Sequence, residues 1–219
     1  MESELLTKTA LFRQSTVDEI EGMLGCLGVR RRSFAAGERI HRMGECIREV
    51  GLVLEGSVRI ENVDVWGNVS VMGTRGPGEM FGEAYAAVPA EPLMVDVVAA
   101  EDCRIMFLTV AKVLTTCPRA CPNHARASAN LTGIIAQQNL ALSRRIFHVA
   151  PKTIRGKVLA YLSDQSERAG SPEFDIPYDR QQLADYLGVD RSALSAELSR
   201  MAREGILQTR RSHFVLTGM

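Results

Sequence analysis

Residues 178–203 read YDRQQLADYLGVDRSALSAELSRMAR, and this stretch decides the C-terminal fold. Leucines at helical spacing predict two short helices, each with one buried side. These leucines are Leu183 and Leu187 in the first helix and Leu194 and Leu198 in the second. Gly188 tolerates the positive φ of the turn, Val189 fills the angle between the helices, and Asp190 is a good N-cap for the second. The pattern predicts a helix-turn-helix unit.

The second helix keeps a small and polar outer face, where the base edges of DNA would be met. Arg191, Ser192 and Ser195 occupy its first turns. An arginine can bind guanine through two hydrogen bonds, and a serine hydroxyl can donate or accept one. The alternative is an ordinary helical hairpin with a solvated face, but the cap, the turn glycine and the small Ala184 at the crossing all fall in register. We therefore expect the three polar residues to contact bases.

A β-hairpin with a basic tip is predicted directly after this helix. Residues 206–207 begin one strand, and residues 214–216 form the other. Arg210 and Arg211 lie in the tip, where they would contact phosphates and position the protein without reading sequence. The alternative for this pair is mere solvation of a turn. The C-terminal segment as a whole is predicted to be a winged helix-turn-helix.

The charge balance sets a condition on any DNA contact. The 219 residues contain 26 Lys and Arg against 26 Asp and Glu, so the net charge is zero. From residue 149 onward the sequence has ten basic and nine acidic residues. DNA binding therefore requires the positive charge to be segregated on one face. The arginines expected to share this face are Arg180, Arg191, Arg200, Arg203, Arg210 and Arg211.

Several classes of protein are disfavoured by what the sequence lacks. No apolar run approaches the roughly 20 residues that a helix needs to cross a bilayer, so no membrane contact is expected. The N-terminal stretch is acidic and has no apolar core of the kind found in signal peptides. Five scattered cysteines do not form a disulfide framework, and a cytoplasmic location is expected. With no Walker-type loop, GxSxG elbow or HExxH motif, no enzymatic function is expected.

The N-terminal half consists of short β-prone runs punctuated by glycines, from residue 33 to residue 108. Strands are expected over residues 52–54, 58–60, 69–71 and 95–98. Many short strands at this spacing indicate a sandwich or a double-stranded β-helix, the jelly roll. Short helical segments precede them, with Ser15 as the expected helix start. Trp66 is expected to pack at a hairpin turn rather than to stack on a ligand.

A long helix is predicted between the two halves, from near Pro122 to about His148. Its apolar residues recur at steps of four and three, which is typical of a coiled-coil seam. The seam comprises Leu131, Ile135, Gln138, Leu142, Ile146 and Val149. We expect this helix to pair with a second copy, with polar Gln138 fixing the register; the alternative is that the seam packs on its own β-roll. The fold class is thus α+β, with a β-roll over residues 1–120, a dimerisation helix over 121–149 and a winged helix-turn-helix over 150–219.

This order of elements resembles the Crp/Fnr family of bacterial transcription regulators. The similarity covers nearly the whole chain. Its most specific pieces are Gly37-Glu38, Gly44-Glu45, residues 56–59, residues 78–83 and residues 183–201. The resemblance implies a sequence-specific transcription regulator that acts as a homodimer on palindromic DNA, with a small-molecule effector in the β-roll reorienting the DNA-binding heads. It also implies contact with RNA polymerase and leaves open whether the protein activates or represses.

The resemblance further implies where an effector would bind. In the family's cyclic-nucleotide binders a Gly-Glu pair holds the ribose, and a downstream Arg followed by Ser or Thr holds the phosphate. This chain has Gly82-Glu83, but Leu93 and Met94 stand in the register of the phosphate-binding pair. Neither offers a charge or a donor, and an unpaired buried anion costs on the order of several kcal/mol. We therefore expect an effector other than cyclic AMP in a more apolar pocket, with Gln138 completing the set of contacts.

In the DNA-binding half, the resemblance assigns phosphate contacts to Arg180 and Gln181 at the start of the first helix. Arg191 matches the first base-reading arginine of the cyclic-AMP receptor protein. That protein has Glu at the position of Ser192 and Arg at the position of Ala196. Both differ here, so we expect a different half-site, read mainly by Arg191.

One local cluster carries another sensing chemistry. Cys117, Cys121 and His124 could bind a soft metal, or the two thiols could cycle between dithiol and disulfide. Three ligands leave a zinc site incomplete, and a proline follows each thiol, so two cysteines that cap a loop are the alternative. The competing function is thus a metal- or thiol-redox-sensing regulator or adaptor.

Iron cofactors have weaker support in the sequence. Haem-binding relatives exist, and His41, His124 or His148 could serve as an axial ligand, although lone histidines are usually surface or capping residues. In the oxygen-sensing branch of the family most cluster cysteines lie in an N-terminal extension, whereas here the first 32 residues hold only Cys26. The sequence therefore assigns no cofactor and does not identify the effector.

Overall fold

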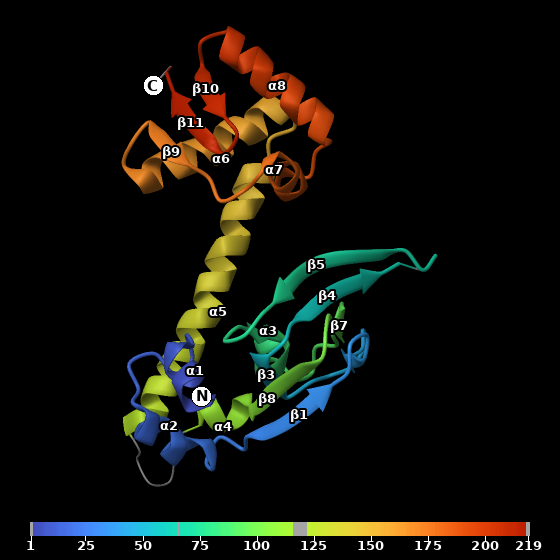
Figure 1. Cartoon of the computed structure of the whole chain (residues 1–219), viewed down its shortest axis with the longest axis vertical. Helices are drawn as coiled ribbons and strands as arrows, with labels where there is room; N and C mark the ends of the chain where they lie inside the picture. The colour runs from blue at the N-terminus through green and yellow to red at the C-terminus, as the bar shows by residue number, and fades with distance from the viewer. Residues whose placement is uncertain (1, 65, 116–121, 218–219) are drawn as a thin grey trace. The chain divides into compact units, whose positions relative to one another are not determined.

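The computed structural model describes residues 2–64, 66–115 and 122–217. The chain divides into two compact units, Met1–Gln137 and Gln138–Met219, and each has its own hydrophobic core (Figure 1). Among the helices of these described ranges, none combines the length and hydropathy needed to cross a bilayer.

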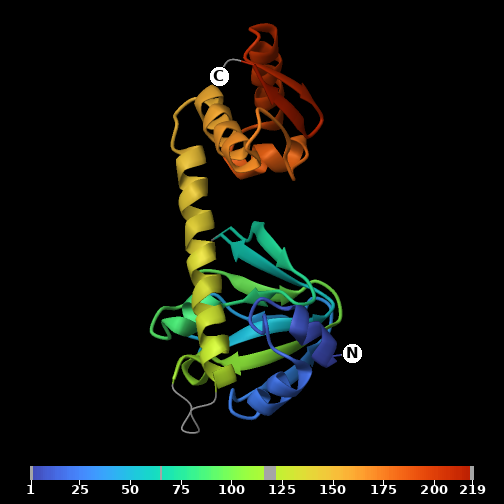
Figure 2. The ribbon, with the colours of Figure 1, turned by 90° about the vertical axis from the view of Figure 1, so that its left-hand side faces the viewer.

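Two four-stranded antiparallel sheets form the β-roll of the first unit (Figure 2). One sheet has the order β1 (Arg30–Phe34), β8 (Cys103–Thr109), β3 (Glu49–Glu55) and β6 (Met80–Phe81). The other has the order β2 (Arg39–His41), β7 (Asp96–Ala99), β4 (Val58–Val63) and β5 (Val69–Arg75). Strands far apart in the sequence, such as β1 and β8, pair with one another. The predicted jelly roll is confirmed.

Apolar side chains from both sheets fill the inside of the β-roll. The rings of Phe34, Phe81 and Phe107 meet edge to face, with centroids 6.2 and 6.4 Å apart. Gly51 on β3 makes room for this packing, because a Cβ atom there would lie 2.1 Å from Cζ of Phe81. A glycine inside this buried strand therefore marks a close approach rather than a turn.

Four short helices and the first part of a long one surround a second apolar cluster in the first unit. The short helices are α1 (Glu2–Lys8), α2 (Val17–Leu24), α3 (Glu83–Ala87) and α4 (Val110–Leu114). Thr16, not the expected Ser15, is the N-cap of α2. Its hydroxyl accepts from the Glu19 amide at 3.3 Å, and the Glu19 carboxylate accepts from the Thr16 amide at 2.9 Å. This reciprocal capping box explains why the helix starts one residue later than expected.

The long helix α5 spans Pro122–Val149, in agreement with the predicted start and end. Its apolar seam divides into two parts. Leu131 is fully buried in the first unit and Ile135 packs beside it, whereas Leu142 and Ile146 are each 63% exposed. A single seam that faces a second helix along its whole length is therefore wrong for its first part, which packs on its own β-roll.

The second unit contains the predicted winged helix-turn-helix. Its elements are α6 (Ile154–Ala169), β9 (Glu173–Asp175), α7 (Arg180–Leu187), α8 (Arg191–Arg203), β10 (Leu207–Arg210) and β11 (His213–Leu216). The four leucines that predicted α7 and α8 are all buried in one core. β10 and β11 form the wing, and β9 pairs with β11 as a third strand that the sequence pattern did not predict.

Trp66, at the turn between β4 and β5, is 84% exposed, so the expectation that it packs there is wrong. Asp64 shapes this turn instead. Its carboxylate accepts from the backbone amides of Trp66 and Asn68 at 2.9 and 2.8 Å. Local hydrogen bonds therefore fix the turn without any contribution from the indole ring.

Candidate nucleic-acid interface and effector region

Side-chain caps set the start of both helices of the helix-turn-helix. Asp179 accepts from the Gln182 amide at 2.8 Å, and the Gln182 side chain accepts from the Asp179 amide at 2.9 Å. In the turn Gly188 has a φ of 61°, which favours glycine. Asp190 accepts from the Ala193 amide at 2.9 Å and begins α8. These caps fix the position of the first side chains of α8.

The two serines expected to contact bases donate their hydroxyl protons to nearby groups of their own chain segment. Ser192 donates to the Asp190 carboxylate, and Ser195 donates to the Arg191 carbonyl at 2.9 Å. The hydrogen bond from Ser192 is the main reason why the pKa of the Asp190 carboxyl lies below its usual value. Ser192 is exposed and Ser195 is half-buried, and their oxygens keep lone pairs that can accept further hydrogen bonds.

A hollow of about 710 Å³ gathers much of the predicted DNA contact surface. The predicted residues in its lining are Arg180, Gln181, Arg191 and Arg211. Side chains from α7, from α8 and from the turn of the wing thus meet at one concave surface. Ser192, Ser195 and Arg210 lie outside this lining; Ser192 and Arg210 are exposed, and Ser195 is half-buried. A concave basic surface suits the phosphate backbone of a nucleic acid.

Not all of the arginines expected on one face reach this hollow. Arg200 instead pairs with Glu197 at 3.0 Å. Arg203 lies in the last turn of α8, about 18 Å along the helix axis from Arg191. Arg200 and Arg203 are therefore not part of this hollow, whose arginines come from α7, from the beginning of α8 and from the turn of the wing.

Arg180 connects α7 to the wing. Its guanidinium carbon lies 5.6 Å from the ring centroid of Phe214, and its Nη2 donates to the Arg211 carbonyl at 3.3 Å. Desolvation in this position lowers the pKa of the guanidinium from its ordinary value, but an arginine stays charged at neutral pH. Arg180 is therefore both a candidate phosphate contact and a support for the hairpin tip.

Gly82 and Glu83 form the entry into α3. Gly82 has a φ of 79°, and a Cβ atom there would lie 2.8 Å from Cδ1 of Ile47, so both backbone conformation and space require a glycine. Glu83 occupies the first turn of α3 and is 5% exposed. The pair is thus held in one conformation by its surroundings.

Leu93 and Met94, two further candidate effector contacts, differ in burial. Leu93 is 3% exposed and packs in the apolar cluster of the first unit, whereas Met94 is 67% exposed. Gln138 belongs to the second unit. Leu93 and Met94 therefore do not line one surface.

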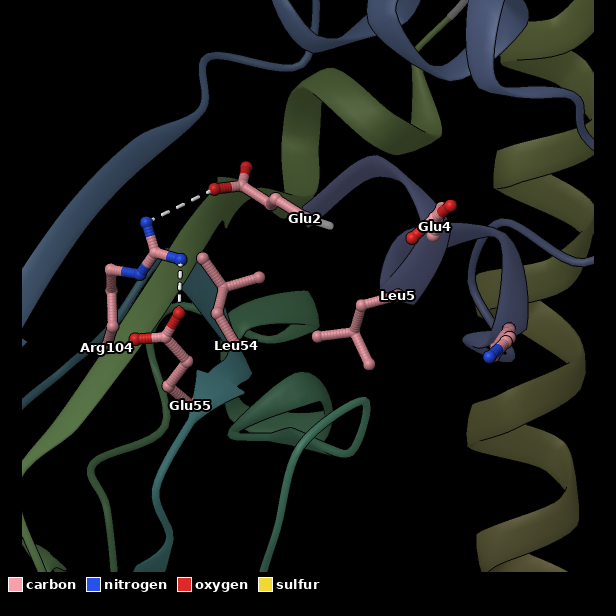
Figure 3. A pocket seen from close by; sticks show the side chains of 7 residues that line it. Glu2, Glu4, Leu5, Leu54, Glu55 and Arg104 are labelled. Carbon is pink, nitrogen blue, oxygen red and sulfur yellow. Dashed lines mark hydrogen bonds and ion pairs between the residues drawn. The ribbon is translucent and has the colours of Figure 1, made fainter.

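A second hollow, of about 330 Å³, lies beside α1 (Figure 3) and was not singled out from the sequence. Arg104 of β8 pairs with Glu55 at 2.6 Å and lies 3.6 Å from Glu2. Arg31 of β1 also pairs with Glu2, at 2.7 Å. The charges compensate one another, so these contacts attach α1 to the sheet. The acidic α1 and the arginine-rich β1 were the available sequence signals.

The predicted metal or redox cluster is only partly within the described residues. Cys117 and Cys121 lie outside them. His124 is buried in α5, and its Nε2 lies 2.5 Å from the carbonyl oxygen of Lys112. In the part of the chain that the structure describes, no group of three His, Cys, Asp or Glu side chains could hold a metal ion.

The other two histidines considered as haem ligands are packed against aromatic rings. His41 meets Phe107 edge to face, with ring centroids 5.9 Å apart, and its Nδ1 lies 3.7 Å from Glu45. His148 contacts the hydroxyl group of Tyr186. Desolvation lowers the pKa of both imidazoles. Both histidines therefore have a packing role in the core.

Two family models match separate parts of the chain. The cyclic nucleotide-binding domain matches residues 31–119, and the Crp-like helix-turn-helix domain matches residues 156–218. The chain is 25% identical over 179 residues to the cyclic AMP receptor protein of Thermus thermophilus. The aligned region covers 82% of this chain and 80% of that protein. It is 20% identical over 195 residues to electron transport regulator A of Shewanella oneidensis, with 85% and 74% covered.

Solved structures of similar fold have low sequence identity to this chain. The catabolite activator protein of Thermus thermophilus has a TM-score of 0.52 at 23% identity and covers 95% of this chain and 93% of its own. The c-di-GMP responsive global regulator CLP of Xanthomonas campestris has a TM-score of 0.54 at 20% identity, with 92% and 99% covered. These likenesses show a shared fold.

Proposed function

The chain belongs to the Crp/Fnr family of transcription regulators, and on that premise we propose that it acts as a homodimer on palindromic duplex DNA under the control of a small-molecule effector. Two DNA-binding domains related by a two-fold axis would read two half-sites. The members of this family are regulators rather than enzymes. We place the activity in the cytoplasm, with RNA polymerase as a further partner.

The observation that carries the DNA-binding proposal is the convergence of Arg180, Arg191 and Arg211 on one hollow. Within the described residues neither Arg191 nor Arg211 forms an ion pair, whereas Arg200 on the same helix as Arg191 does. A guanidinium without a carboxylate partner can neutralise a phosphate or bind a base edge at no cost in broken ion pairs. The lining of this hollow therefore favours an anionic ligand.

The side chains at the beginning of α8 favour particular bases. Arg191 would bind guanine through two hydrogen bonds, worth about 1–3 kcal/mol of discrimination. Because Ser192 and Ser195 donate their own protons locally, their oxygens would act as acceptors in the groove. Acceptors favour the amino groups of adenine and cytosine. Gln181 and Arg210 would contact phosphates and set the register.

Exposed apolar side chains on α5 support the homodimer. Leu142 and Ile146 continue the predicted seam, and each is 63% exposed. Leu140 and Phe147, on another side of the same helix, are 54% and 72% exposed. Burial of one such side chain contributes about 1.5–3 kcal/mol. We assign Leu142 and Ile146 to a coiled-coil contact with α5 of a second copy.

The effector is proposed to bind the β-roll near Gly82 and Glu83 and to differ from cyclic AMP. A cyclic phosphodiester needs a cation or several donors, and Leu93 and Met94 supply neither. Met94 and Gln138 are further proposed contacts of the effector. A ligand with less negative charge than a cyclic nucleotide fits these residue types better.

Selection of binding sites from a random DNA pool tests the proposed function. The dimer should enrich palindromes whose half-site centres lie about 10 base pairs, or a multiple, apart. Arg191→Ala should remove the preference at one position of each half-site. Arg168→Ala is the matched control, because this side chain is 59% exposed on α6, and it should leave the selected sequence unchanged. A pool with no sequence preference at any salt concentration would overturn the proposal.

A further inference from the structure

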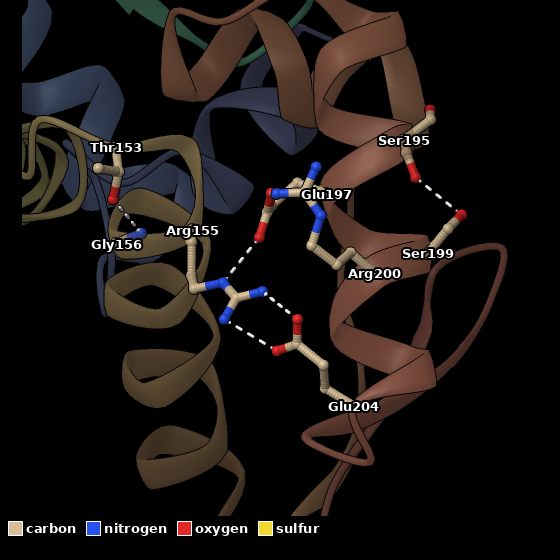
Figure 4. A network of polar contacts seen from close by, with 8 residues as sticks. All are labelled: Thr153, Arg155, Gly156, Ser195, Glu197, Ser199, Arg200 and Glu204. Atoms are coloured by element: carbon tan, nitrogen blue, oxygen red, sulfur yellow. Dashed lines mark hydrogen bonds and ion pairs between the residues drawn. The ribbon is translucent and has the colours of Figure 1, made fainter.

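Arg155, near the start of α6, joins that helix to α8 through a set of polar contacts (Figure 4). Its Nε donates to Glu197 at 2.7 Å, and its two terminal nitrogens lie 2.9 and 2.8 Å from the two carboxylate oxygens of Glu204. The Glu197 carboxylate also accepts a hydrogen bond from Nη1 of Arg200 at 3.0 Å. One guanidinium therefore holds two carboxylates that lie two helical turns apart on α8. We refer to Arg155, Glu197 and Glu204 as the arginine clamp.

The backbone that carries Arg155 is itself held firmly. Thr153 is the N-cap of α6, and its hydroxyl accepts from the Gly156 amide at 3.0 Å. A Cβ atom at Gly156 would lie 2.8 Å from Cβ of Pro151, so the tight start of the helix requires glycine there. The clamp thus connects α8 to the start of α6, where the backbone has little freedom to move.

The clamp restrains α8 in a way that its apolar contacts do not. Leu194, Leu198 and Met201 bury one side of the helix, but apolar contacts are non-directional and resist separation more than rotation or sliding. The planar arginine fork has a fixed geometry and resists both movements. About 20 Å of helix separate Glu204 from Arg191, so a tilt of about 5° at Glu204 would displace Arg191 by about 2 Å.

The exposure of the clamp argues against a mainly stabilising role. The side chains of Arg155 and Glu204 are 35% and 41% exposed, whereas that of Glu197 is 12% exposed. Ion pairs with this much access to water contribute little to stability. The two contacts between Arg155 and Glu204 still favour one orientation of α8, because both can form together only when the carboxylate faces the planar guanidinium.

We propose that Arg155 is a positioning residue that sets the orientation of the first turns of α8, where Arg191 would read bases. It thereby controls the affinity for the specific DNA sequence more than the affinity for non-specific DNA. The inference rests on the proposed function, because it requires α8 to read bases. The candidate phosphate contacts Arg180 and Arg211 lie on α7 and the wing. Because neither residue is carried by α8, non-specific binding should persist without the clamp.

The test compares affinities for the selected palindrome and for a shuffled duplex at the same salt concentration. Arg155→Ala should lower the ratio of the two affinities about tenfold or more, since small misplacements of reading groups are costly. Arg155→Lys keeps the positive charge and the aliphatic part of the side chain but not the planar guanidinium. It should lower the ratio of the specific to the non-specific affinity almost as much as Arg155→Ala. Arg168→Ala, on the same helix, should change nothing. Affinity for the shuffled duplex and its salt dependence should stay as in the parent protein.

A double-mutant cycle and an unfolding curve separate positioning from stability. If Arg155 and Glu204 act as a unit, the double alanine variant should lose no more discrimination than Arg155→Ala alone. A merely structural role predicts a lower unfolding midpoint and an unchanged affinity ratio for folded protein. Discrimination within twofold of the parent in both Arg155→Ala and Arg155→Lys would overturn the inference. If the parent protein prefers the selected palindrome over the shuffled duplex and Arg191→Ala does not, the proposed function is supported independently of the results for the clamp variants.

Discussion

Nδ1 of His148 lies 2.9 Å from the hydroxyl oxygen of Tyr186, and this contact joins the end of α5 to α7. His148 is 4% exposed, and its ring meets that of Tyr161 edge to face with centroids 5.4 Å apart. Desolvation lowers the pKa of the imidazole, against the opposing effect of the Asp164 carboxylate 3.6 Å from Nε2. The second unit therefore contains a buried histidine at the end of α5 that packs between α6 and α7 and is kept neutral by its burial.

Mild acidification should destabilise the second unit for this reason. The unfolded chain binds a proton at His148 near the ordinary pKa of 6.5, whereas the folded chain does so only at lower pH. The contribution is fully present above about pH 6.5 and is lost as the pH falls toward the folded pKa. His148→Gln should flatten this dependence. Urea denaturation between pH 7 and pH 5, followed through the tyrosines of this unit, measures it; parallel curves for the two proteins would refute the assignment.

Two glycines in the first unit should respond to alanine in opposite ways. At Gly51 a Cβ atom would meet the ring of Phe81, which is 2% exposed and has no space to move into. Gly51→Ala should therefore lower the free energy of unfolding by about 1–3 kcal/mol. At Gly22, in α2, nothing lies within 4 Å of the added carbon. Gly22→Ala should stabilise the helix by about 0.5–1 kcal/mol, and equal shifts in urea midpoint for both variants would contradict the packing described for β3.

Short-range patterns were sufficient to predict the helix-turn-helix. A cap and a tight turn depend on residues within a few positions of one another, so the amino-acid sequence alone was enough to assign Asp190 and Gly188. The same holds for β3, β4, β5 and β7 of the β-roll, where apolar runs and glycines are local signals, whereas β1, β2, β6 and β8 were not predicted as strands. Ser15 was misassigned because the neighbouring Thr16 has the same capping chemistry, and only the spacing to Glu19 distinguishes them.

Relations between distant residues could not be predicted in this way. Helical spacing placed Leu131 and Ile146 on one stripe, but a period does not say which surface covers each part of it. Likewise Leu93 and Met94 are neighbours in the sequence but differ completely in burial, and no pattern of two adjacent residues outside a helix or strand shows which of them faces the core. Arg155 and its partner Glu204 lie 49 residues apart, and no local pattern connects them.

Acidic substitutions on the exposed part of α5 should separate the dimer. Leu142→Glu together with Ile146→Glu places two charges in the proposed coiled-coil seam, where their burial is not compensated. Sedimentation should then give a monomer, and affinity for a palindrome should fall toward that for a single half-site. Ala141→Glu is the matched control, because this exposed residue lies on another side of the helix. A double variant that sediments like the parent protein would exclude this seam.

Arg180→Ala should weaken DNA binding without changing sequence preference. A phosphate contact is lost, and with it about one unit of the slope of log affinity against log salt concentration. The wing also loses the hydrogen bond from Arg180 to the Arg211 carbonyl, so the loss in affinity should exceed that of Gln181→Ala at the adjacent position. Fluorescence anisotropy over a salt series measures both quantities. An unchanged slope would restrict Arg180 to its structural contact with the wing.

Cyclic AMP should not stabilise this protein. A ligand that binds only the native state raises the free energy of unfolding by about 2.7 kcal/mol at a hundredfold excess over its Kd. Binding of the phosphodiester would need a cation where this chain has Leu93, buried among apolar side chains, and Met94, which is exposed. Millimolar cyclic AMP should therefore leave the unfolding midpoint of the first unit in place, and native mass spectrometry should detect no complex. A midpoint that rises with cyclic AMP concentration would mean that a cation elsewhere in the β-roll serves the phosphate, and the assignment of the effector region would then be wrong.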